Sequence, residues 1–352
     1  MQLNKNSKIF LAGHSGMVGS SILRYFKKKG YKRIIKQNRN KLNLLNQRST
    51  YRFLKKIKPD FVIIAAAKVG GIYANDICKG DFIYQNLMIQ TNIIHSSYLV
   101  GVKKLIFLGS SCIYPKLSKQ PIKESYLLDG KLESTNESYA IAKIAGLKMC
   151  EAYNKQYNLN YLCLMPTNLY GPNDNYDLET SHVLPALINK IHFAKKNNLK
   201  KVDVWGTGNP KREFLYVDDL ADACVFIMEH DISDGLYNIG TQKDITIREL
   251  VDLISNIIGF NGYINFDKSM RVLDVGAGTG VMSRYAAERG AEVVALEGDS
   301  MRAELASLRC EGLNVDVRCG IVNDFDDSEG FDLILVIGVL EYATNHPAAP
   351  AG

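Results

Sequence analysis

Tyr139 and Lys143 are the residues whose types and spacing most directly suggest chemistry. They lie four positions apart in a segment with a helical pattern, so both side chains project from one helix face. Upstream, the apolar run at 104–108 is typical of a buried strand, and Ser110-Ser111-Cys112 follows its end. A phenol beside an ammonium, with a hydroxyl facing both, can give a proton to a carbonyl oxygen or take one from an alcohol. The group therefore predicts hydride chemistry on a ketone.

Spacing alone does not single out this pair, because Tyr25 with Lys29 and Tyr51 with Lys55 share it. Neither of these two pairs follows a strand that ends in serine. We therefore expect both to lie on solvated helix faces. The position of Tyr139 after a serine-bearing strand end is what selects it.

A glycine-rich turn, Gly13-His14-Ser15-Gly16-Met17-Val18-Gly19, joins an apolar strand at 9–12 to a helix at 17–29. Glycines let the backbone approach a pyrophosphate, whose charge the N-terminus of a helix favours. The second strand, at 33–36, is followed by Arg39 rather than by an acidic residue. An acid there would hold a ribose 2′-hydroxyl, whereas arginine suits a 2′-phosphate. The turn predicts a dinucleotide site, and Arg39 favours NADP over NAD.

The fold class follows from apolar strands that alternate with helices. Further strands are predicted at 61–65, 104–108 and 161–165, and helices near 47–57, 82–100 and 137–157. This alternation predicts an α/β fold with a Rossmann-type, doubly wound parallel sheet, covered on both faces, over about residues 6–165. A small, truncated α/β substrate lobe follows at about 166–269. The strand-helix pattern then restarts, which predicts a partial second Rossmann-like unit over 270–352.

The 352 residues, 46% hydrophobic and 23% charged, are typical of a globular protein with room for two domains. The polar start has no signal-peptide pattern, and the longest apolar run, at 333–340, is too short to span a bilayer. The seven cysteines are odd in number and lack metal-ligand spacing. These features predict a cytoplasmic protein with free thiols, without a metal site and without a membrane partner.

The net charge of +6 conceals two segments of opposite sign. Residues 270–352 contain no lysine, 6 arginines and 14 acidic residues, a net charge of −8, so residues 1–269 carry +14. Such a shift at one point predicts two sequences of different origin joined at 269/270. The lysines of the first segment are dispersed rather than striped with aromatics. This argues against a nucleic-acid partner and favours a small anionic ligand.

Seven motifs of the first segment resemble, in order, those of the extended short-chain dehydrogenases/reductases and, more narrowly, of the GDP-L-fucose synthases. The resemblance covers about residues 6–268. Long motifs in a conserved order make such a resemblance specific. The motifs are residues 13–19, 65–71, 109–115, 139–146, 166–172, 181–185 and 212–219.

The resemblance implies 3,5-epimerisation and 4-reduction of GDP-4-keto-6-deoxy-mannose by five side chains. Tyr139 would protonate O4 as NADPH delivers hydride to C4, and Lys143 would lower the tyrosine pKa and hold the nicotinamide ribose. Ser110 would hydrogen-bond the keto oxygen. Cys112 would remove protons from C3 and C5, and His182 would reprotonate the opposite face. A thiol and an imidazole suit these roles because both titrate near neutral pH.

Taken alone, a cysteine after a strand is usually a small core residue, and a loop histidine is usually structural. Cys112 and His182 both fall where the family places its epimerase pair, which reverses that expectation. The pair also separates this hypothesis from another NAD(P)-dependent nucleotide-sugar epimerase or dehydratase.

The resemblance further implies two binding sets and a homodimer that pairs through the helices at 82–100 and 137–157. Lys190, Trp205 and Arg212 would contact the GDP-sugar, with Lys190 standing where the family often has arginine. The NADP(H) contacts would be residues 13–19, Arg39, Leu108, Gly109, Ser110, Ser111, Lys143, Pro166, Thr167, Asn168, Leu169 and His182.

The family pattern stops at 269, before a loop with a substrate-contacting Asp and the last helices of the substrate lobe. Residues 272–280 instead resemble the first motif of class I S-adenosylmethionine-dependent methyltransferases. Glu297 would then bind the ribose hydroxyls, and Asp324 would lie near the adenine. The remaining candidate contacts are Asp274, Gly276, Gly278 and Gly280. Because the segment ends before the remaining strands and any acceptor site, we expect weak S-adenosylmethionine binding or none.

Two alternatives to the epimerase/reductase hypothesis remain. The chain could be a methyltransferase fragment fused to a non-functional reductase remnant, which S-adenosylmethionine binding would favour. It could also be a chimera of two gene fragments without a joint function, which a sequencing read across codons 269 and 270 would test.

Overall fold

The computed structural model of the chain divides into two units. The first comprises Met1–Asn197 and Lys211–Phe260, and the second comprises Asn198–Pro210 and Asn261–Gly352. The predicted junction at 269/270 lies outside the described residues. The structure describes residues 3–178, 180–230, 232, 235–267, 271–322, 325, 331 and 333–336.

The first unit is built on a six-stranded parallel sheet in the order β2-β1-β3-β4-β5-β9. Each of β1, β3 and β4 is a continuous run of buried residues, as expected for strands that pack on both faces. The prediction of an α/β, Rossmann-type sheet is therefore confirmed. The strands are β1 (Ile9–Ala12), β2 (Ile34–Ile35), β3 (Phe61–Ile64), β4 (Lys104–Leu108), β5 (Asn160–Pro166) and β9 (Gly235–Ile239).

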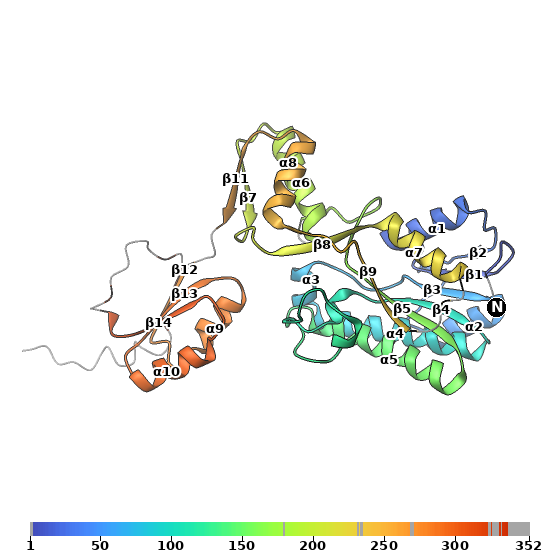
Figure 1. The fold of residues 1–352 in the computed structure, drawn as a ribbon, viewed down its shortest axis with the longest axis horizontal. Helices are drawn as coiled ribbons and strands as arrows, with labels where there is room; N and C mark the ends of the chain where they lie inside the picture. Colours follow the sequence, from blue (N-terminus) through green and yellow to red (C-terminus); the bar gives the residue numbers. More distant parts are fainter. Residues whose placement is uncertain are drawn as a thin grey trace, which may run out of the picture. The chain divides into compact units, whose positions relative to one another are not determined.

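Helices cover both faces of this sheet (Figure 1). On one face, Ile22 and Leu220 belong to the apolar cluster that includes Ile9; on the other, Leu54 and Leu147 belong to the cluster that includes Phe10. The first face is covered by α1 (Met17–Lys28) and α7 (Val217–Glu229). The second is covered by α2 (Gln47–Ile57), α4 (Lys79–Leu99) and α5 (Glu137–Tyr157).

The order of the strands places a crevice beside β1. The chain leaves β1 for β2 on one side and returns to β3 on the other, with Ile9 paired to both Ile34 and Phe61. At such a switch point the loops after the two inner strands diverge, and a ligand can enter between them. The glycine-rich turn after β1 and the loop after β3 therefore meet at the carboxyl edge of the sheet.

The rest of the first unit contains helices predicted at 183–194 and 247–258 and a strand predicted near 213–217, together with three strands, β6, β9 and β10, that the sequence patterns did not predict. β6 and β10 flank β8 in a three-stranded sheet, and β9 extends the main sheet. These segments have three to five residues and are not fully buried, so they lack the long apolar runs of the inner strands. The remaining elements are α3 (Ile72–Ile77), η1 (Ser111–Ile113), η2 (Glu124–Tyr126), β6 (Asn168–Tyr170), α6 (Val183–Lys196), β8 (Lys211–Tyr216), β10 (Asp244–Thr246) and α8 (Ile247–Ile258).

The second unit contains a four-stranded parallel sheet in the order β14-β13-β12-β15 and a parallel pair of β7 with β11. One face of the larger sheet packs Val272 and Val293 against Ala287. After residue 270 the sequence pattern predicts strands at 271–275, 292–296, 314–318 and 331–337 and helices at 280–289 and 300–311, and the observed bounds agree closely with these. The elements of this unit are β7 (Lys201–Trp205), β11 (Tyr263–Asp267), β12 (Arg271–Val275), α9 (Val281–Glu288), β13 (Glu292–Glu297), α10 (Ser300–Arg309), β14 (Val315–Cys319) and β15 (Leu333–Val336).

Candidate active site

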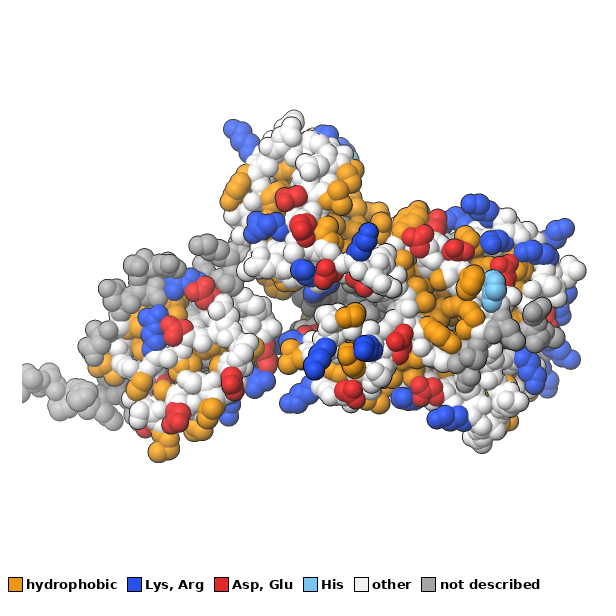
Figure 2. Space-filling view, viewed as in Figure 1, with side chains coloured by type: hydrophobic (Ala, Val, Ile, Leu, Met, Phe, Trp, Pro, Cys, Tyr) orange, Lys and Arg blue, Asp and Glu red, His pale blue; other side chains and the backbone are white. Residues whose placement is uncertain are grey.

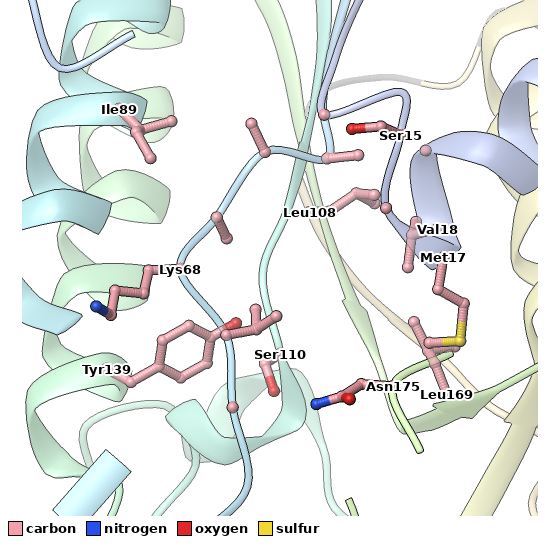
Figure 3. A pocket seen from close by; sticks show the side chains of 18 of the residues that line it. Ser15, Met17, Val18, Lys68, Ile89, Leu108, Ser110, Tyr139, Leu169 and Asn175 are labelled. Carbon is pink, nitrogen blue, oxygen red and sulfur yellow. The ribbon is translucent and has the colours of Figure 1, made fainter. Parts of the chain in front are cut away.

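A cavity of about 740 Å³ opens at the carboxyl edge of the six-stranded sheet. The glycine-rich turn forms one wall, and in Figure 3 the Tyr139 ring extends from its helix toward the space where Ser110 also lies. The cavity wall includes every residue of the predicted cofactor set: residues 13–19, Arg39, 108–111, Lys143, 166–169 and His182. Segments far apart in the sequence thus meet around one space large enough for a dinucleotide and part of a second ligand.

The glycine-rich turn is packed so tightly that no side chain fits at Gly13 or Gly19. A Cβ at Gly13, where φ is +87°, would lie 2.5 Å from the amide nitrogen of Ala66 in the loop after β3. A Cβ at Gly19 would collide with the carbonyl oxygen of Gly13. The turn is therefore a bare backbone cradle at the start of α1, a geometry that fits a pyrophosphate. Arg39 on the same cavity wall fits the 2′-phosphate of NADP(H).

The helix α5 is held close to β4 at the point where it carries Tyr139 and Lys143. Gly146 permits this approach, because a Cβ there would lie 2.7 Å from the Phe107 ring. The Lys143 ammonium donates a hydrogen bond of 2.8 Å to the Leu108 carbonyl oxygen at the end of β4. The same ammonium lies 5.6 Å from the centre of the Tyr139 ring. The predicted phenol-ammonium arrangement is thus fixed to the strand that ends in Ser110.

Burial shifts both groups toward their neutral forms. It lowers the pKa of Lys143 to about 8, against a smaller opposing effect of the Cys112 thiol. Burial, followed by the nearby Cys112, raises the pKa of Tyr139, whereas the sequence argument expected Lys143 to lower it. In this pocket the phenol therefore holds its proton, which is the state that a proton donor to a ketone oxygen needs.

Cys112 lies in η1, two residues after Ser110, and acts electrostatically on Tyr139 and Lys143. It is partly buried and is not among the described residues that form the cavity wall. Burial raises the pKa of its thiol, while the Ser110 hydroxyl and the Lys143 charge oppose this rise. The thiol and the phenol thus converge on one region, with the thiol set back from the open space.

His182 is exposed at the first turn of α6, on the cavity wall, and its side chain makes no capping bond to that helix. Surrounding protein lowers the imidazole pKa, and the negative charge of Asp174 opposes the change. Asp174 lines the same cavity but was not a sequence candidate. Its only sequence signal was that it follows the turn-rich motif at 166–172. Lys68 of the wall lies within the motif at 65–71, whereas Ile89 and Asn175 had no sequence signal and reach the wall only through the fold.

Unlike the predicted cofactor contacts, the predicted substrate contacts do not line the described cavity. Lys190 in α6 and Arg212 in β8 are exposed, and neither belongs to the described cavity wall. The Arg212 guanidinium donates to the Lys211 carbonyl oxygen at 2.8 Å. Trp205 ends β7 in the second unit and is 79% exposed.

The two other Tyr-x-x-x-Lys pairs lie outside the described cavity wall. The Tyr25 hydroxyl donates to Asp222 on α7, and the Lys29 ammonium lies 3.8 Å from Glu229. The Lys55 ammonium lies over the Tyr51 ring of its own helix at 5.6 Å. Both pairs are therefore helix-surface features, as the absence of an upstream serine turn predicted.

The second unit carries its own glycine-rich turn, between β12 and α9. Gly276, Gly278 and Gly280 all have positive φ angles. The Glu297 carboxylate at the end of β13 accepts hydrogen bonds from the Gly278 and Asp299 amides at 2.6 and 3.0 Å. Buried Asp274 accepts one from the Ser283 hydroxyl at 2.6 Å. The structure thus brings the predicted glycines and Glu297 together, while Asp324 lies outside the described residues.

Two findings bear on other classes of site. Of the helices in the described part of the chain, none combines the length and apolar character that a membrane crossing needs. Across those same residues, His, Cys, Asp and Glu side chains form no group of three that could hold a metal ion. On the face that Figure 2 shows, Lys and Arg side chains are interspersed with acidic and apolar ones.

Comparisons with known proteins give two family matches. Residues 9–240 match the NAD dependent epimerase/dehydratase family, and residues 272–351 match a methyltransferase domain. The chain is 54% identical over 264 residues to GDP-L-fucose synthase 1 of Arabidopsis thaliana, covering 75% of this chain and 82% of the relative. It is 51% identical over 271 residues to GDP-L-fucose synthase of Escherichia coli, covering 74% and 84%.

Solved structures show the same likeness. A GDP-D-glycero-L-gluco-heptose synthase of Campylobacter jejuni, determined in the presence of NADPH, is 39% identical with a TM-score of 0.72, over 75% of this chain and 89% of that one. A GDP-L-fucose synthetase of Naegleria fowleri bound to NADP is 29% identical with a TM-score of 0.70, over 76% and 82%. The chain therefore belongs to the NAD dependent epimerase/dehydratase family and, within it, to the GDP-L-fucose synthases.

Proposed function

We propose that this protein makes GDP-L-fucose, by 3,5-epimerisation and NADPH-dependent 4-reduction of GDP-4-keto-6-deoxy-mannose. The observation that carries the proposal is the single cavity that joins the glycine-rich turn to Ser110, Tyr139, Lys143 and His182. The family membership supplies the substrate class. NADPH, when bound, supplies a hydride; the residues of this chain bind, orient and move protons.

In the reduction, the Tyr139 phenol gives its proton to O4 as the carbonyl carbon becomes an alcohol carbon. The raised pKa keeps the phenol protonated until that moment. Ser110 donates a hydrogen bond to the keto oxygen and orients it. The buried Lys143 ammonium then stabilises the phenolate, because the attraction of opposite charges is strong away from water.

In the epimerisation, the C4 ketone makes the hydrogens on C3 and C5 acidic. Cys112 as thiolate removes each proton, and the electron pair moves onto the keto oxygen, where Ser110 and Tyr139 donate hydrogen bonds. His182 returns a proton to the opposite face of the carbon. The thiolate is formed against the cost of burial, with the Lys143 charge and the Ser110 hydroxyl in its favour.

The test measures oxidation of NADPH and deuterium exchange from solvent at C3 and C5 of GDP-4-keto-6-deoxy-mannose. We expect Tyr139→Phe to lower the rate of reduction by about 10²–10⁴-fold, the range for loss of a general acid, and to leave much of the exchange. Cys112→Ser should remove the exchange. Tyr25→Phe, from the helix-surface pair, is the matched control. A wild-type protein that neither oxidises NADPH nor exchanges deuterium would contradict the proposal.

We assign the finer contacts and the setting in the same way. Lys190, Trp205 and Arg212 would contact the GDP-sugar, and two copies would pair through α4 and α5, which expose Tyr84, Leu99 and Ile141. The seven cysteines are all free thiols, which supports a reducing cytoplasm. Light scattering of the purified chain tests the dimer.

A second function, S-adenosylmethionine binding by residues 270–352, is favoured by Glu297 beneath the glycine-rich turn of the second unit. The described sheet of this unit has four strands, so we expect weak binding or none. Calorimetric titration of the full chain with S-adenosylmethionine, with Glu297→Gln as control, measures it. Tight binding lost in Glu297→Gln would instead favour the methyltransferase alternative.

A further inference from the structure

The carboxyl end of β9 hydrogen-bonds to two loops that border the cavity. The Asn238 side chain accepts a hydrogen bond of 2.5 Å from the Tyr114 hydroxyl, two residues beyond Cys112. The next residue, Ile239, accepts one of 3.1 Å from the Thr167 amide, in the loop that lines the cofactor side of the cavity. One edge strand thus connects to both the thiol turn and the cofactor loop.

Asn238 also holds the chain that follows the thiol turn. Its side-chain amide donates to the Ile122 carbonyl oxygen at 3.2 Å. Its backbone amide donates to the Glu124 carboxylate at 2.9 Å. A single residue therefore fixes the segment 114–124 at both ends. Asn238 itself is fixed because β9 pairs with β5, with Asn238 opposite Met165.

The turn that bears Cys112 depends on this attachment, because its own hydrogen bonds are long. The Tyr114 amide reaches the Ser111 carbonyl oxygen at 3.3 Å, and the Cys112 amide reaches the Ser110 hydroxyl at 3.5 Å. Bonds of this length are weak. Directly after the thiol, Ile113 is fully buried and Tyr114 is 4% exposed. The position of the thiol is therefore set by where Tyr114 is anchored.

We propose that Asn238 is a positioning residue that holds the Cys112 thiol beside the cavity by anchoring Tyr114. The role in catalysis rests on the proposed function, in which this thiol is the base. The anchor itself is a property of the fold and can be measured separately. The second connection of β9, from the Thr167 amide to the Ile239 carbonyl oxygen, does not involve Tyr114. Removal of the Tyr114 hydroxyl should therefore leave the cofactor loop in place.

The first test measures how fast iodoacetamide alkylates Cys112 in the full chain, followed peptide by peptide with mass spectrometry. Tyr114→Phe and Asn238→Ala should each raise the rate at Cys112 several-fold, because the partly buried turn is released. Cys319, which is exposed in the second unit, is the internal reference and should not change. Tyr126→Phe is the matched control, because Tyr126 packs against the same apolar cluster and its hydroxyl has no partner among the described residues.

The outcomes are separable. An unchanged Cys112 rate in Tyr114→Phe, which removes one oxygen and is the milder variant, overturns the proposal even if Asn238→Ala fails to fold. In the folded variants, deuterium exchange at C3 and C5 should fall several-fold more than NADPH oxidation does. Equal losses in both would contradict a role centred on the thiol. Absence of both activities in the wild type would contradict the proposed function, while the alkylation rates would still decide the anchor.

Discussion

The two units each place a glycine-rich turn after the first strand of a parallel sheet, yet the turns are supported differently. At Gly13 the neighbouring loop approaches so closely that a Cβ would lie 2.5 Å from the Ala66 amide nitrogen, so only the hydrogen of glycine fits. At Gly278 nothing lies within 4 Å of the space that a Cβ would fill. There the Gly278 amide instead donates to the Glu297 carboxylate, while the amides of Gly276 and Ala277 donate to the Leu296 carbonyl oxygen. Similar sequence motifs thus give one turn packed against a neighbouring loop at its first glycine and one whose middle glycine is open and hydrogen-bonded to a carboxylate.

The difference extends to the sheets behind the turns. The first sheet has six strands and, among the described residues, two clusters of nineteen buried apolar side chains each. The second has four strands and two clusters of four. Since burial of apolar surface is the main source of stability, the first unit can hold a precise site and the second has far less to hold one with. A sequence motif therefore predicts the local geometry of a turn, whereas the size of the apolar core determines how stable that geometry is.

The largest effect that the comparison predicts is for alanine in the two turns. Gly19→Ala would place a Cβ against the Gly13 carbonyl and the His14 Cα, which are backbone atoms that cannot move aside as a flexible side chain could. We expect this variant to lose NADPH binding and to unfold at a much lower temperature. Gly278→Ala should cost only about 1–2 kcal/mol, the strain of a positive φ. Thermal unfolding and NADPH fluorescence measure both, and equal effects would contradict the difference in support.

The next effect concerns pH and the buried ammonium. Because the pKa of Lys143 is lowered to about 8, the fraction of charged amine falls as pH rises through 8. The kcat/KM for NADPH oxidation, which reports the ionisation of the free enzyme, should therefore decline about tenfold per pH unit well above that value, since the phenolate loses its counter-charge. Lys143→Arg, which stays charged, should remove this alkaline limb even if its rate is low. A profile flat to pH 10 in the wild type would contradict the assignment.

A smaller effect distinguishes the residues that follow the second strand of each sheet. In the first unit Arg39, which follows β2, lines the cavity. In the second unit the corresponding position after the second strand is taken by an acid, Glu297 at the end of β13. Arg39→Ala should raise the KM for NADPH by about 10–100-fold, the value of one charge-assisted contact, and leave the KM for NADH nearly unchanged. Steady-state kinetics with both cofactors test this. Equal losses for the two would mean that Arg39 does not contact a 2′-phosphate.

Much of this site could be predicted because its residues sit at strand ends. Gly13, Ser110 and Thr167 each follow an inner strand, and the carboxyl ends of parallel strands meet at one edge. A continuous apolar run identifies the strand, so it also locates the residue after it. For the same reason the bounds of β12 to β14 agree with those predicted.

What the sequence could not reveal are contacts made by short or irregular segments. β9 has five residues, none of them fully buried, so its sequence shows no apolar run that predicts a strand. The contact of Asn238 with Tyr114 could therefore not be predicted. Asp174 reaches the cavity through a loop whose path depends on its own hydrogen bonds, such as that from the Asn175 side chain to Thr180 at 2.9 Å. The expected lowering of the Tyr139 pKa failed for a related reason: the depth of burial is a tertiary property.

The smallest expected effect is on the pH dependence of the stability of the second unit, which involves the Asp274 carboxyl. This carboxyl is 2% exposed, and burial raises its pKa above the usual 3.8, with Glu297 adding to the rise. The folded state therefore binds a proton more tightly than the unfolded state, so stability should fall as pH rises from about 4 through the raised pKa. Asp274→Asn, neutral at every pH, should abolish that dependence.

Ser283→Ala tests the same carboxylate from its partner. Removal of the hydroxyl that donates to Asp274 at 2.6 Å leaves a buried charge without that donor. We expect a loss of about 1–3 kcal/mol at neutral pH, the usual cost of an unmade buried hydrogen bond. Ser307→Ala, at an exposed position of α10, is the control. Hydrogen exchange of the peptide that contains β12, measured in the full chain, reports this unit alone. Because its core is small, a loss of this size should expose β12 to exchange, whereas protection of β1 should not change.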